Sequence, residues 1–369
     1  MKIGIDARLY GAQKNRGIGR YIEKLLYHLQ NIDTTNQYYI FLLPENYELF
    51  SITAKNFHKI KVNIPWYSWR EQLLWPFILY FYNFDLVHFT HFNVPIIYGR
   101  KYIITLHDLI MTHYTDDRST TKNKYIYKIK ICLARFMVNF TARKAKGIIC
   151  PSQYTRSDVV KHLKIKKENC YVIYEAVESQ PAQILTDDFD KRLIPGKFFL
   201  YVGAAYPHKN LERMINGFLK FNKSDHYYLV LVGRQDYFYS RLREKYKNKN
   251  KIIFIGPVSD RELAYLYSQA IAFIFPSLIE GFGLPPLEAM QYNCPVISSN
   301  SSCLPEVLGE AALFFNPSQE EEISACLNKI ITDKVLGENL RSKGKMLLQK
   351  YSWIKMATET AQLYKRFGK

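Results

Sequence analysis

Short apolar runs alternate with helical patterns along the first part of this chain. The runs that predict buried strands lie at 2–6, 38–43, 85–89, 102–106 and 147–150. Between the first two runs, apolar residues recur at helical steps, at Ile18, Tyr21, Ile22, Leu25, Leu26 and Leu29. Strands that alternate with amphipathic helices indicate a doubly wound parallel sheet.

A second alternation begins after a polar stretch. Its predicted strands lie at 198–202, 228–232, 252–255 and 271–275, and each is followed by Gly or Pro. Ser259 and Glu262 form a capping-box pattern that starts a helix between two of these strands. The pattern therefore predicts a second Rossmann-like half, in which ligands bind where the strands end.

The periodicity fails around 175–195, where polar residues and two prolines take over, and we place a hinge there. We expect three parts: a first Rossmann-like domain at 1–180, a second at 196–350, and a C-terminal helix at 351–369 that crosses back to the first domain. A length of 369 residues exceeds the usual size of one core, and 48% hydrophobic residues are enough for two. The two halves are expected to face each other across a cleft.

The net charge of +18 attracts nucleic acid, anionic lipid or negatively charged substrates, and it does not choose among them. The segment 118–147 carries nine Lys or Arg and no acidic residue, interleaved with apolar residues, which is typical of a basic amphipathic helix. The aromatic stretch 66–82 is too short and too interrupted by proline to span a bilayer. Contact of both segments with a membrane surface and a core-plus-solvated-face arrangement both remain open.

The residues at the start and the cysteines indicate a cytosolic chain. An acidic residue, Asp6, stands where a signal peptide needs an apolar segment, so we expect a first strand and no export. The cysteines are scattered without CxxC spacing, which predicts buried thiols and neither disulfides nor zinc. They are Cys132, Cys150, Cys170, Cys294, Cys303 and Cys326.

The segment 280–288 reads Glu-Gly-Phe-Gly-Leu-Pro-Pro-Leu-Glu and follows a predicted buried strand. Gly281 and Gly283 permit unusual dihedrals, and Pro286 suits a first helical turn. The loop amides and the positive end of the helix can then face an anion such as a diphosphate. Glu280 and Glu288 are placed to hold hydroxyls on two parts of one ligand; the alternative is a tight loop with two solvated glutamates.

Three other features lie at predicted strand ends. Lys209 sits at a helix start, where a cation opposes the helix dipole, so an anion between the two is one explanation and an ordinary surface lysine the other. Gly17 and Gly19 form a glycine-rich turn before the first helix, although Ile22 replaces the third glycine of a dinucleotide fingerprint. His107 is placed to donate to a sugar hydroxyl or to serve as a structural histidine.

Other polar candidates rank lower. His88 and His91 bracket another strand end. Acidic pairs at 116–117 and 187–188, and the pattern 188–190, resemble a DxD magnesium motif but lack a preceding apolar strand. We therefore interpret them as solvated loops and expect no metal.

Taken together, these residues resemble the retaining glycosyltransferases of the GT-B fold, in the large family four, over nearly the whole chain. The resemblance rests on 280–288 as an E-x7-E motif, on 203–211, on 255–260 with Leu263 and Tyr267, on 295–297 with 304–307, and on 17–21, His107-Asp108 and Pro151-Ser152. Within that family the chain is most similar to bacterial mannosyl- or rhamnosyltransferases that build O-antigen and related surface polysaccharides.

The resemblance implies roles for these residues. It implies that Glu288 holds the ribose, Glu280 the transferred sugar and Lys209 the diphosphate, with Glu280, Lys209 and His107 as the catalytic set. The further donor-binding residues that it implies are Gly17, Gly19, Val258, Gly281, Phe282, Gly283 and Leu284. Ala204 stands where many members have an arginine, so His208 and Arg234 become candidate helpers at the diphosphate.

The expected function is retaining, metal-independent transfer of a hexose without a cofactor. The favoured donor is GDP-mannose, with UDP- and dTDP-sugars open, and the acceptor is a glycan or polyprenyl-linked saccharide. We expect the enzyme at the inner face of the cytoplasmic membrane, docked through 118–147 on anionic lipid. The alternatives are a GT-B-fold sugar-nucleotide epimerase or phosphorylase, and a basic nucleic-acid-binding protein, for which no recognised module is present.

Overall fold

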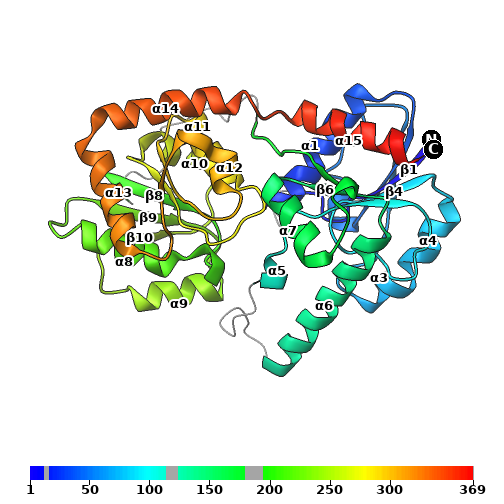
Figure 1. Cartoon of the computed structure of the whole chain (residues 1–369), viewed down its shortest axis with the longest axis horizontal. Helices are drawn as coiled ribbons and strands as arrows, with labels where there is room; N and C mark the ends of the chain where they lie inside the picture. The colour runs from blue at the N-terminus through cyan, green and yellow to red at the C-terminus, as the bar shows by residue number, and fades with distance from the viewer. Residues whose placement is uncertain (12–15, 114–123, 179–193, 369) are drawn as a thin grey trace. The chain divides into compact units, whose positions relative to one another are not determined.

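The chain folds as two compact units, each built around one parallel sheet (Figure 1). The computed structural model describes residues 1–11, 16–113, 124–178 and 194–368. The first unit takes in the described residues of Met1–His113, Tyr125–Glu175 and Ser352–Lys369, and the second takes in those of Ala176–Tyr351. Most of the predicted hinge at 175–195 lies outside the described residues.

The sheet of the first unit has seven parallel strands in the order β3-β2-β1-β4-β5-β6-β7. They are β1 (Lys2–Asp6), β2 (Gln37–Leu42), β3 (Phe57–Lys61), β4 (Leu86–Phe89), β5 (Tyr102–Thr105), β6 (Gly147–Cys150) and β7 (Cys170–Val172). The five predicted strands are confirmed within a residue at each end. The two unpredicted strands, β3 and β7, lie at the sheet edges, where one is mostly polar and the other is very short, so neither gives an apolar run.

Helices cover this sheet, and the last of them comes from the C-terminal end. They are α1 (Arg16–Ile32), α2 (Pro44–Tyr47), α3 (Trp69–Leu73), α4 (Trp75–Tyr82), α5 (Ile110–His113), α6 (Lys124–Lys144), α7 (Gln153–Leu163) and α15 (Trp353–Phe367). The apolar stripe predicted for α1 is buried, apart from the half-buried Ile18. Beside it lies α15 (Figure 1), where Tyr364 is fully buried and its hydroxyl is 2.7 Å from Nδ1 of His88. The last helix therefore completes the core of the first unit.

The sheet of the second unit has six parallel strands in the order β10-β9-β8-β11-β12-β13. They are β8 (Phe198–Val202), β9 (Tyr228–Val232), β10 (Ile252–Ile255), β11 (Phe273–Phe275), β12 (Val296–Ser299) and β13 (Ala312–Phe315). The helices are α8 (Leu211–Phe221), α9 (Tyr237–Lys245), α10 (Asp260–Gln269), α11 (Leu284–Gln291), α12 (Leu304–Leu308), α13 (Glu320–Thr332) and α14 (Lys334–Leu348). The predicted capping box opens α10, because the Ser259 hydroxyl accepts from the Glu262 amide and Glu262 accepts from the Ser259 amide.

Both sheets share one strand order, in which the chain runs outward from the middle in one direction and then in the other. The reversal falls between β1 and β4 in the first unit and between β8 and β11 in the second. In open α/β sheets, ligands bind beyond the carboxyl ends of the strands at such a reversal. The fold thus marks one candidate ligand position in each unit.

A buried ion-pair network lies at the reversal of the first unit. Arg8 is only 2% exposed and donates to Asp6 (2.8 and 2.7 Å), to Glu71 (2.7 Å) and to the carbonyl of Ile64 (3.1 Å). Burial raises the pKa of Glu71, although Arg8 acts in the opposite direction. The guanidinium also lies over the Trp75 ring, 4.8 Å from its centroid. One arginine therefore fixes the segment after β1 to α3 and α4.

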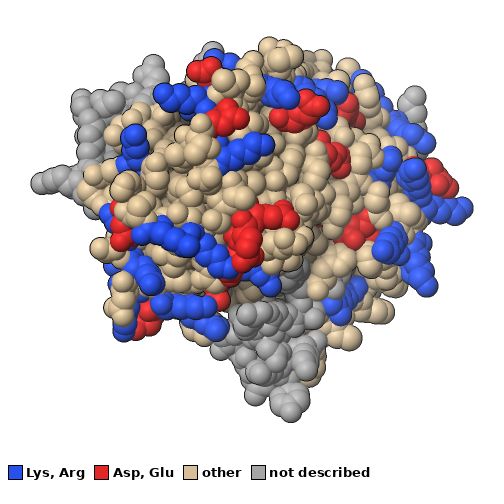
Figure 2. Space-filling model, turned by 60° about the vertical axis from the view of Figure 1, so that its left-hand side comes forward, with Lys and Arg blue, Asp and Glu red and all other residues tan. Residues whose placement is uncertain are grey.

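Surface charge and helix composition bear on the expected membrane contact. Among the helices of the described residues, none combines the length and the apolar character that crossing a bilayer needs. Figure 2 shows Lys and Arg side chains spread over the face that it draws, with Asp and Glu among them. The positive charge on that face is therefore distributed and is not one continuous patch.

We predict that Arg8→Met destabilises the protein by about 3–5 kcal/mol at neutral pH, because Asp6 and Glu71 would remain buried without a cation. Burial raises the pKa of Glu71 in the folded state, and loss of Arg8 removes the opposing effect, so the cost is greatest above that pKa and falls as the pH falls. Urea unfolding of wild type and variant at about pH 7 and about pH 5 tests this. An equal difference at both pH values would contradict it, and adding Asp6→Asn and Glu71→Gln should recover much of the loss.

Candidate functional site

The reversal point of the second unit brings Lys209 to Glu280. Lys209 follows β8 and Glu280 follows β11, and these two strands are neighbours in the sheet. Their side chains form an ion pair with 2.5 Å between Nζ and Oε1, and the side chains are 18% and 11% exposed. Two residues that are 71 positions apart thus meet at the place where the fold predicts a ligand.

Backbone and side-chain hydrogen bonds fix the two loops that carry this pair. Asn210, buried and in the left-handed conformation (φ 60°), donates to the carbonyls of Pro276 (3.2 Å) and Pro317 (2.7 Å). The amide of Leu278 donates to the His208 carbonyl (2.8 Å), which joins the loop after β8 to the loop after β11. The amide of Glu280 itself donates to the Ser302 hydroxyl (3.0 Å). The pair is therefore held by its backbone as well as by its charges.

The pair has a direct chemical consequence. Lys209 lies in a short 3₁₀ turn (Pro207–Lys209) ahead of α8, and its ammonium is also 5.8 Å from the Phe275 ring centroid. An anion that binds Lys209 competes with the Glu280 carboxylate for the N–H donors of one ammonium and can displace it. Once displaced, the carboxylate can accept hydrogen bonds from hydroxyl groups. A diphosphate linked to a polyol presents both kinds of group.

The two suggested helpers of Lys209 differ in charge. Burial, aided by the neighbouring Lys209, lowers the pKa of His208 to about 4, so its imidazole is neutral at neutral pH. His208 can offer a hydrogen bond to a phosphate there but no positive charge. Arg234 is exposed and directly follows β9 and Gly233, next in the sheet to β8. Of these two residues, Arg234 is therefore the one that offers an additional full charge at this edge.

The glycine loop leads straight into a helix. Gly283 has φ +90° and stands at the N-cap of α11, with proline in the first turn. A Cβ at Gly283 would lie 2.9 Å from Cδ2 of Leu304, so glycine is needed for conformation and for space. The Phe282 side chain is 3% exposed and packs edge-to-face on Tyr351 (5.4 Å). The Phe282 side chain is therefore packed inside the unit, and its backbone is the part that can contact a ligand.

The other two predicted donor residues sit on separate elements. Glu288 is half-buried in the second turn of α11, where the Tyr267 hydroxyl lies 3.5 Å from its Oε2. Val258 is half-buried between β10 and the capping box of α10. Because β10 and β11 end at the same edge of the sheet, Val258 lies at the edge that carries Lys209 and Glu280, and α11, which carries Glu288, starts from that edge.

In the first unit, the prediction of a glycine turn at 16–20 is wrong. The helix α1 already begins at Arg16, so Gly17 and Gly19 lie in its first turn. A Cβ at Gly19 would come within 2.5 Å of the Gly11 carbonyl oxygen, whereas one at Gly17 would meet nothing within 4 Å. Gly19 therefore permits close packing of the segment after β1 on α1, and Gly17 is exposed.

His107 follows β5 and is bonded through both ring nitrogens. Nδ1 lies 3.0 Å from Oε1 of Glu175, and Nε2 lies 3.1 Å from the carbonyl oxygen of Thr90. The ring also meets Tyr21 edge-to-face at 4.8 Å. Glu175, which ends the middle segment of the first unit, was not among the predicted site residues. The strand before it, β7, is too short to give an apolar run, so no predicted strand end marked this position.

The remaining histidines and acidic pairs of the sequence analysis take no evident place in this site. Burial, followed by the effect of His107, lowers the pKa values of His88 and His91 to about 3, so both are neutral at neutral pH. The acidic pairs at 116–117 and 187–188 and the pattern 188–190 lie outside the described residues. Five of the cysteines are buried as predicted, while Cys132 is exposed on α6.

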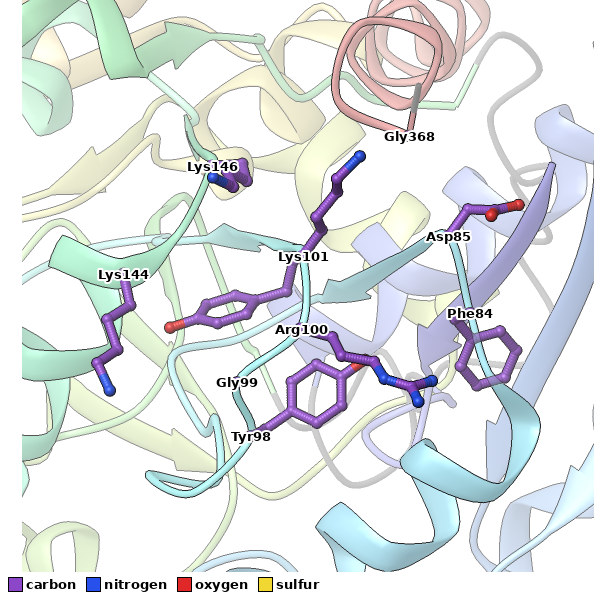
Figure 3. Close-up of a pocket in the computed structure, with 10 residues that line it drawn as sticks. Phe84, Asp85, Tyr98, Gly99, Arg100, Lys101, Lys144, Lys146 and Gly368 are labelled. Carbon is purple, nitrogen blue, oxygen red and sulfur yellow. The ribbon is translucent and has the colours of Figure 1, made fainter.

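A separate basic pocket opens at the other end of the first sheet (Figure 3). It has a volume of about 590 Å³, and its lining includes Arg100, Lys101, Lys144, Lys146 and the carboxylate of Asp85. These residues precede β4, β5 and β6, so they surround the amino ends of the strands and not the carboxyl ends. The pocket is thus distinct from the reversal point, and the sequence analysis did not predict it.

Comparison with known proteins adds a family to this geometry. The chain matches Glycosyltransferase Family 4 over residues 16–180 and Glycosyl transferases group 1 over residues 185–346. It is 34% identical over 272 residues to the O-antigen chain mannosyltransferase RfbU of Salmonella typhimurium, covering 72% of this chain and 70% of that protein. It is 28% identical over 294 residues to the O-antigen chain mannosyltransferase B of Escherichia coli, covering 77% and 75%.

A solved structure extends the likeness over the whole fold. HepE of Anabaena, in complex with UDP and glucose, superposes with a TM-score of 0.74 and 16% identity, covering 99% of this chain and 100% of that one. At this identity the likeness concerns the fold alone.

Proposed function

This chain belongs to the group 1 glycosyltransferases and has the predicted GT-B fold, and we propose that it transfers mannose from GDP-mannose to a lipid-linked or polysaccharide acceptor. The observation that carries the choice of sugar is the 34% identity to an O-antigen chain mannosyltransferase over 72% of the chain. A second relative with a mannosyltransferase name, at 28% identity, supports the same sugar.

The proposed donor site is the carboxyl edge of the second sheet. Lys209 leaves its ion pair with Glu280 to bind the diphosphate, and the released carboxylate accepts hydrogen bonds from the mannosyl hydroxyls. Backbone amides of the 281–284 loop add donors for the same ligand, and the positive end of α11 faces it, although Pro285 and Pro286 in the first turn have no N–H. Glu288 accepts from the ribose hydroxyls, and Val258 lies against the base. The ion pair observed between Lys209 and Glu280 supports this arrangement, because it places a cation and a carboxylate side by side at the strand ends.

The proposed transfer needs no metal. Cleavage of the bond to the anomeric carbon leaves negative charge on the departing diphosphate, and Lys209, the loop amides and the positive end of α11 stabilise it. Arg234 adds charge at this edge, and neutral His208 adds a hydrogen bond. Because both glutamates hold hydroxyls, we assign neither as nucleophile, and the acceptor attacks on the face that the diphosphate leaves, with retention of configuration.

The first unit provides the acceptor side in this proposal. In this proposal Gly17 and Gly19 also contact the donor phosphates, and His107 contacts the transferred mannose. Glu175 and the Thr90 carbonyl hold the ring of His107 in one orientation. Because both ring nitrogens already face acceptors within the first unit, contact with the mannose exchanges one of these hydrogen bonds for one to the sugar. The place of His107 directly after β5 supports the assignment.

We predict that Glu280→Gln reduces mannosyl transfer by at least about a hundredfold, in line with the loss of one preorganised polar group at a reacting centre. Lys209→Met should weaken binding of GDP itself by about 1.5–3 kcal/mol, the contribution of a hydrogen bond to a charged group. Transfer is measured with GDP-mannose and an acceptor glycan, and GDP binding by calorimetry.

The matched control is the exposed ion pair between Lys245 and Glu212, also in the second unit (2.6 Å). Lys245→Met should leave both transfer and GDP binding unchanged. Wild-type transfer by folded Glu280→Gln would refute its role. Consumption of GDP-mannose at an equal rate with and without acceptor would instead indicate an epimerase or hydrolase.

Donor choice can be tested without an acceptor. A ligand that binds only the folded protein raises its melting temperature, and at a hundred times its Kd the stabilisation is about 2.7 kcal/mol. We expect GDP-mannose to give a larger thermal shift than equal concentrations of UDP-glucose or dTDP-rhamnose, and Lys209→Met to reduce it. A larger shift with a UDP- or dTDP-sugar would refute the donor assignment while leaving the enzyme class intact.

We further propose that the enzyme works at the inner face of the cytoplasmic membrane and docks on anionic lipid through the segment 118–147. Its described part is mainly α6, which has two apolar faces. On one face Ile131, Val138 and Ala142 are buried, as is Ala145 directly after the helix. On the other, the described side chains of Ile129 (61%), Leu133 (57%) and Phe136 (58%) are exposed. Exposed apolar side chains on a helix rich in Lys and Arg favour a negatively charged lipid surface.

We predict that Phe136→Ser lowers binding to vesicles with anionic lipid about tenfold, because burial of one phenyl group contributes about 1.5–3 kcal/mol. Ile354→Ser, at a similarly exposed apolar position on α15, is the control and should bind like wild type. Flotation with anionic and with zwitterionic vesicles measures both. Equal partitioning of wild type to the two kinds of vesicle would rule out charge-dependent docking.

A further inference from the structure

Two histidines and an aspartate converge on the surface of the first unit. Nε2 of His113 lies 2.9 and 2.7 Å from the two carboxylate oxygens of Asp158, and Nε2 of His162 lies 3.4 Å from Oδ1 of the same carboxylate. The imidazole rings are 4.7 Å apart and nearly perpendicular. One atom from each of these three side chains could bind a metal ion, and these atoms all lie within 4.8 Å of one another. In the described part of the chain, this is the group of His, Cys, Asp or Glu residues with that arrangement.

The fold explains why these three residues meet. Asp158 and His162 are four positions apart on α7, so they share one face of that helix. His113 ends α5, which follows β5, while α7 follows β6, the next strand in the sheet. The Asp158 side chain is 9% exposed, and those of His113 and His162 are 25% and 41% exposed. An ion in solution can therefore reach the two nitrogens, and the carboxylate lies behind them.

We propose that His113, Asp158 and His162 bind a divalent transition-metal ion of the zinc class. Two imidazole nitrogens and one carboxylate oxygen, with a fourth position left to water, form a common zinc ligand set. Bonds of about 2.0–2.1 Å in tetrahedral geometry place ligand atoms about 3.3 Å apart. The separations of 2.7–3.4 Å between the imidazole nitrogens and the carboxylate oxygens lie around that value. Small side-chain rotations therefore suffice to admit the ion.

The ion takes the place of the contacts that now join the two imidazoles to the carboxylate. The chain's net charge of +18, with Lys161 beside His162, opposes any cation, so affinity depends on the three ligands and not on the surrounding field. Because the positive charge opposes binding of the ion, substitution of one ligand should weaken that binding measurably.

The bound ion would join α5 to α7. Because α5 begins three residues after His107, the ion also restrains the segment that carries His107. The site uses residues of the first unit alone and does not depend on the donor assignment. Its role in this inference is to brace that segment, and no step of sugar transfer passes through it.

Calorimetric titration of Zn²⁺ into the full-length protein without a histidine tag tests the site. We expect one ion per chain for wild type, and visible absorption of tetrahedral Co²⁺ when cobalt replaces zinc. His162→Ala and Asp158→Asn should each weaken binding at least tenfold, since even loss of an outer-shell partner costs about 10–100-fold in metal affinity.

The matched control is His226→Ala in the second unit. This histidine is exposed, and its Nδ1 lies 2.9 Å from the Ser224 carbonyl oxygen. It should bind Zn²⁺ like wild type. Absence of saturable one-to-one binding in wild type, or wild-type affinity in both His162→Ala and Asp158→Asn, would overturn the proposal and leave a hydrogen-bonded cluster. Neither result bears on mannosyl transfer, which is measured separately.

Discussion

The pairing of β8 with β11 is the constraint on which the candidate donor site depends. It makes neighbours of two loops that are far apart in sequence, and it sets the Lys209 ammonium against the Glu280 carboxylate. Hydrogen bonds from Asn210 and Leu278 then hold the loops in register. Because the parallel strands end together, the glycine loop and the start of α11 come to the same edge. One strand pairing thus gathers a cation, an anion and the backbone of the glycine loop.

The same strand order operates in the first unit with different side chains. There the reversal between β1 and β4 is occupied by Arg8, whose guanidinium is shared between two buried carboxylates. A network of this kind is expensive to break and leaves little freedom in the segment after β1. The second unit instead keeps a single, partly exposed ion pair at its reversal. The difference matches a rigid support on one side and an exchangeable ligand contact on the other.

Polar groups around the candidate site are set in definite states by their surroundings. Burial keeps His88, His91 and His208 neutral near neutral pH, since it lowers their pKa values to about 3, 3 and 4. His107, by contrast, has an acceptor at each ring nitrogen. The surroundings of each ring, and not its residue type, therefore decide which contacts these histidines make.

Local patterns in the sequence determined most of the strands, the capping box of α10, the glycine-to-helix loop at 280–288 and the two-unit organisation. These features depend on short-range periodicity and turn chemistry, which neighbouring residues encode. Edge strands such as β3 escaped because partly exposed strands give no apolar run. The start of α1 at Arg16 was missed because the two glycines indicated a turn. The crossing of the C-terminal helix back to the first unit was also predicted, whereas only the tertiary structure decided that Lys209 meets Glu280 and that Glu175 holds His107. Those contacts join distant segments, and strand order, which no local pattern records, brings them together.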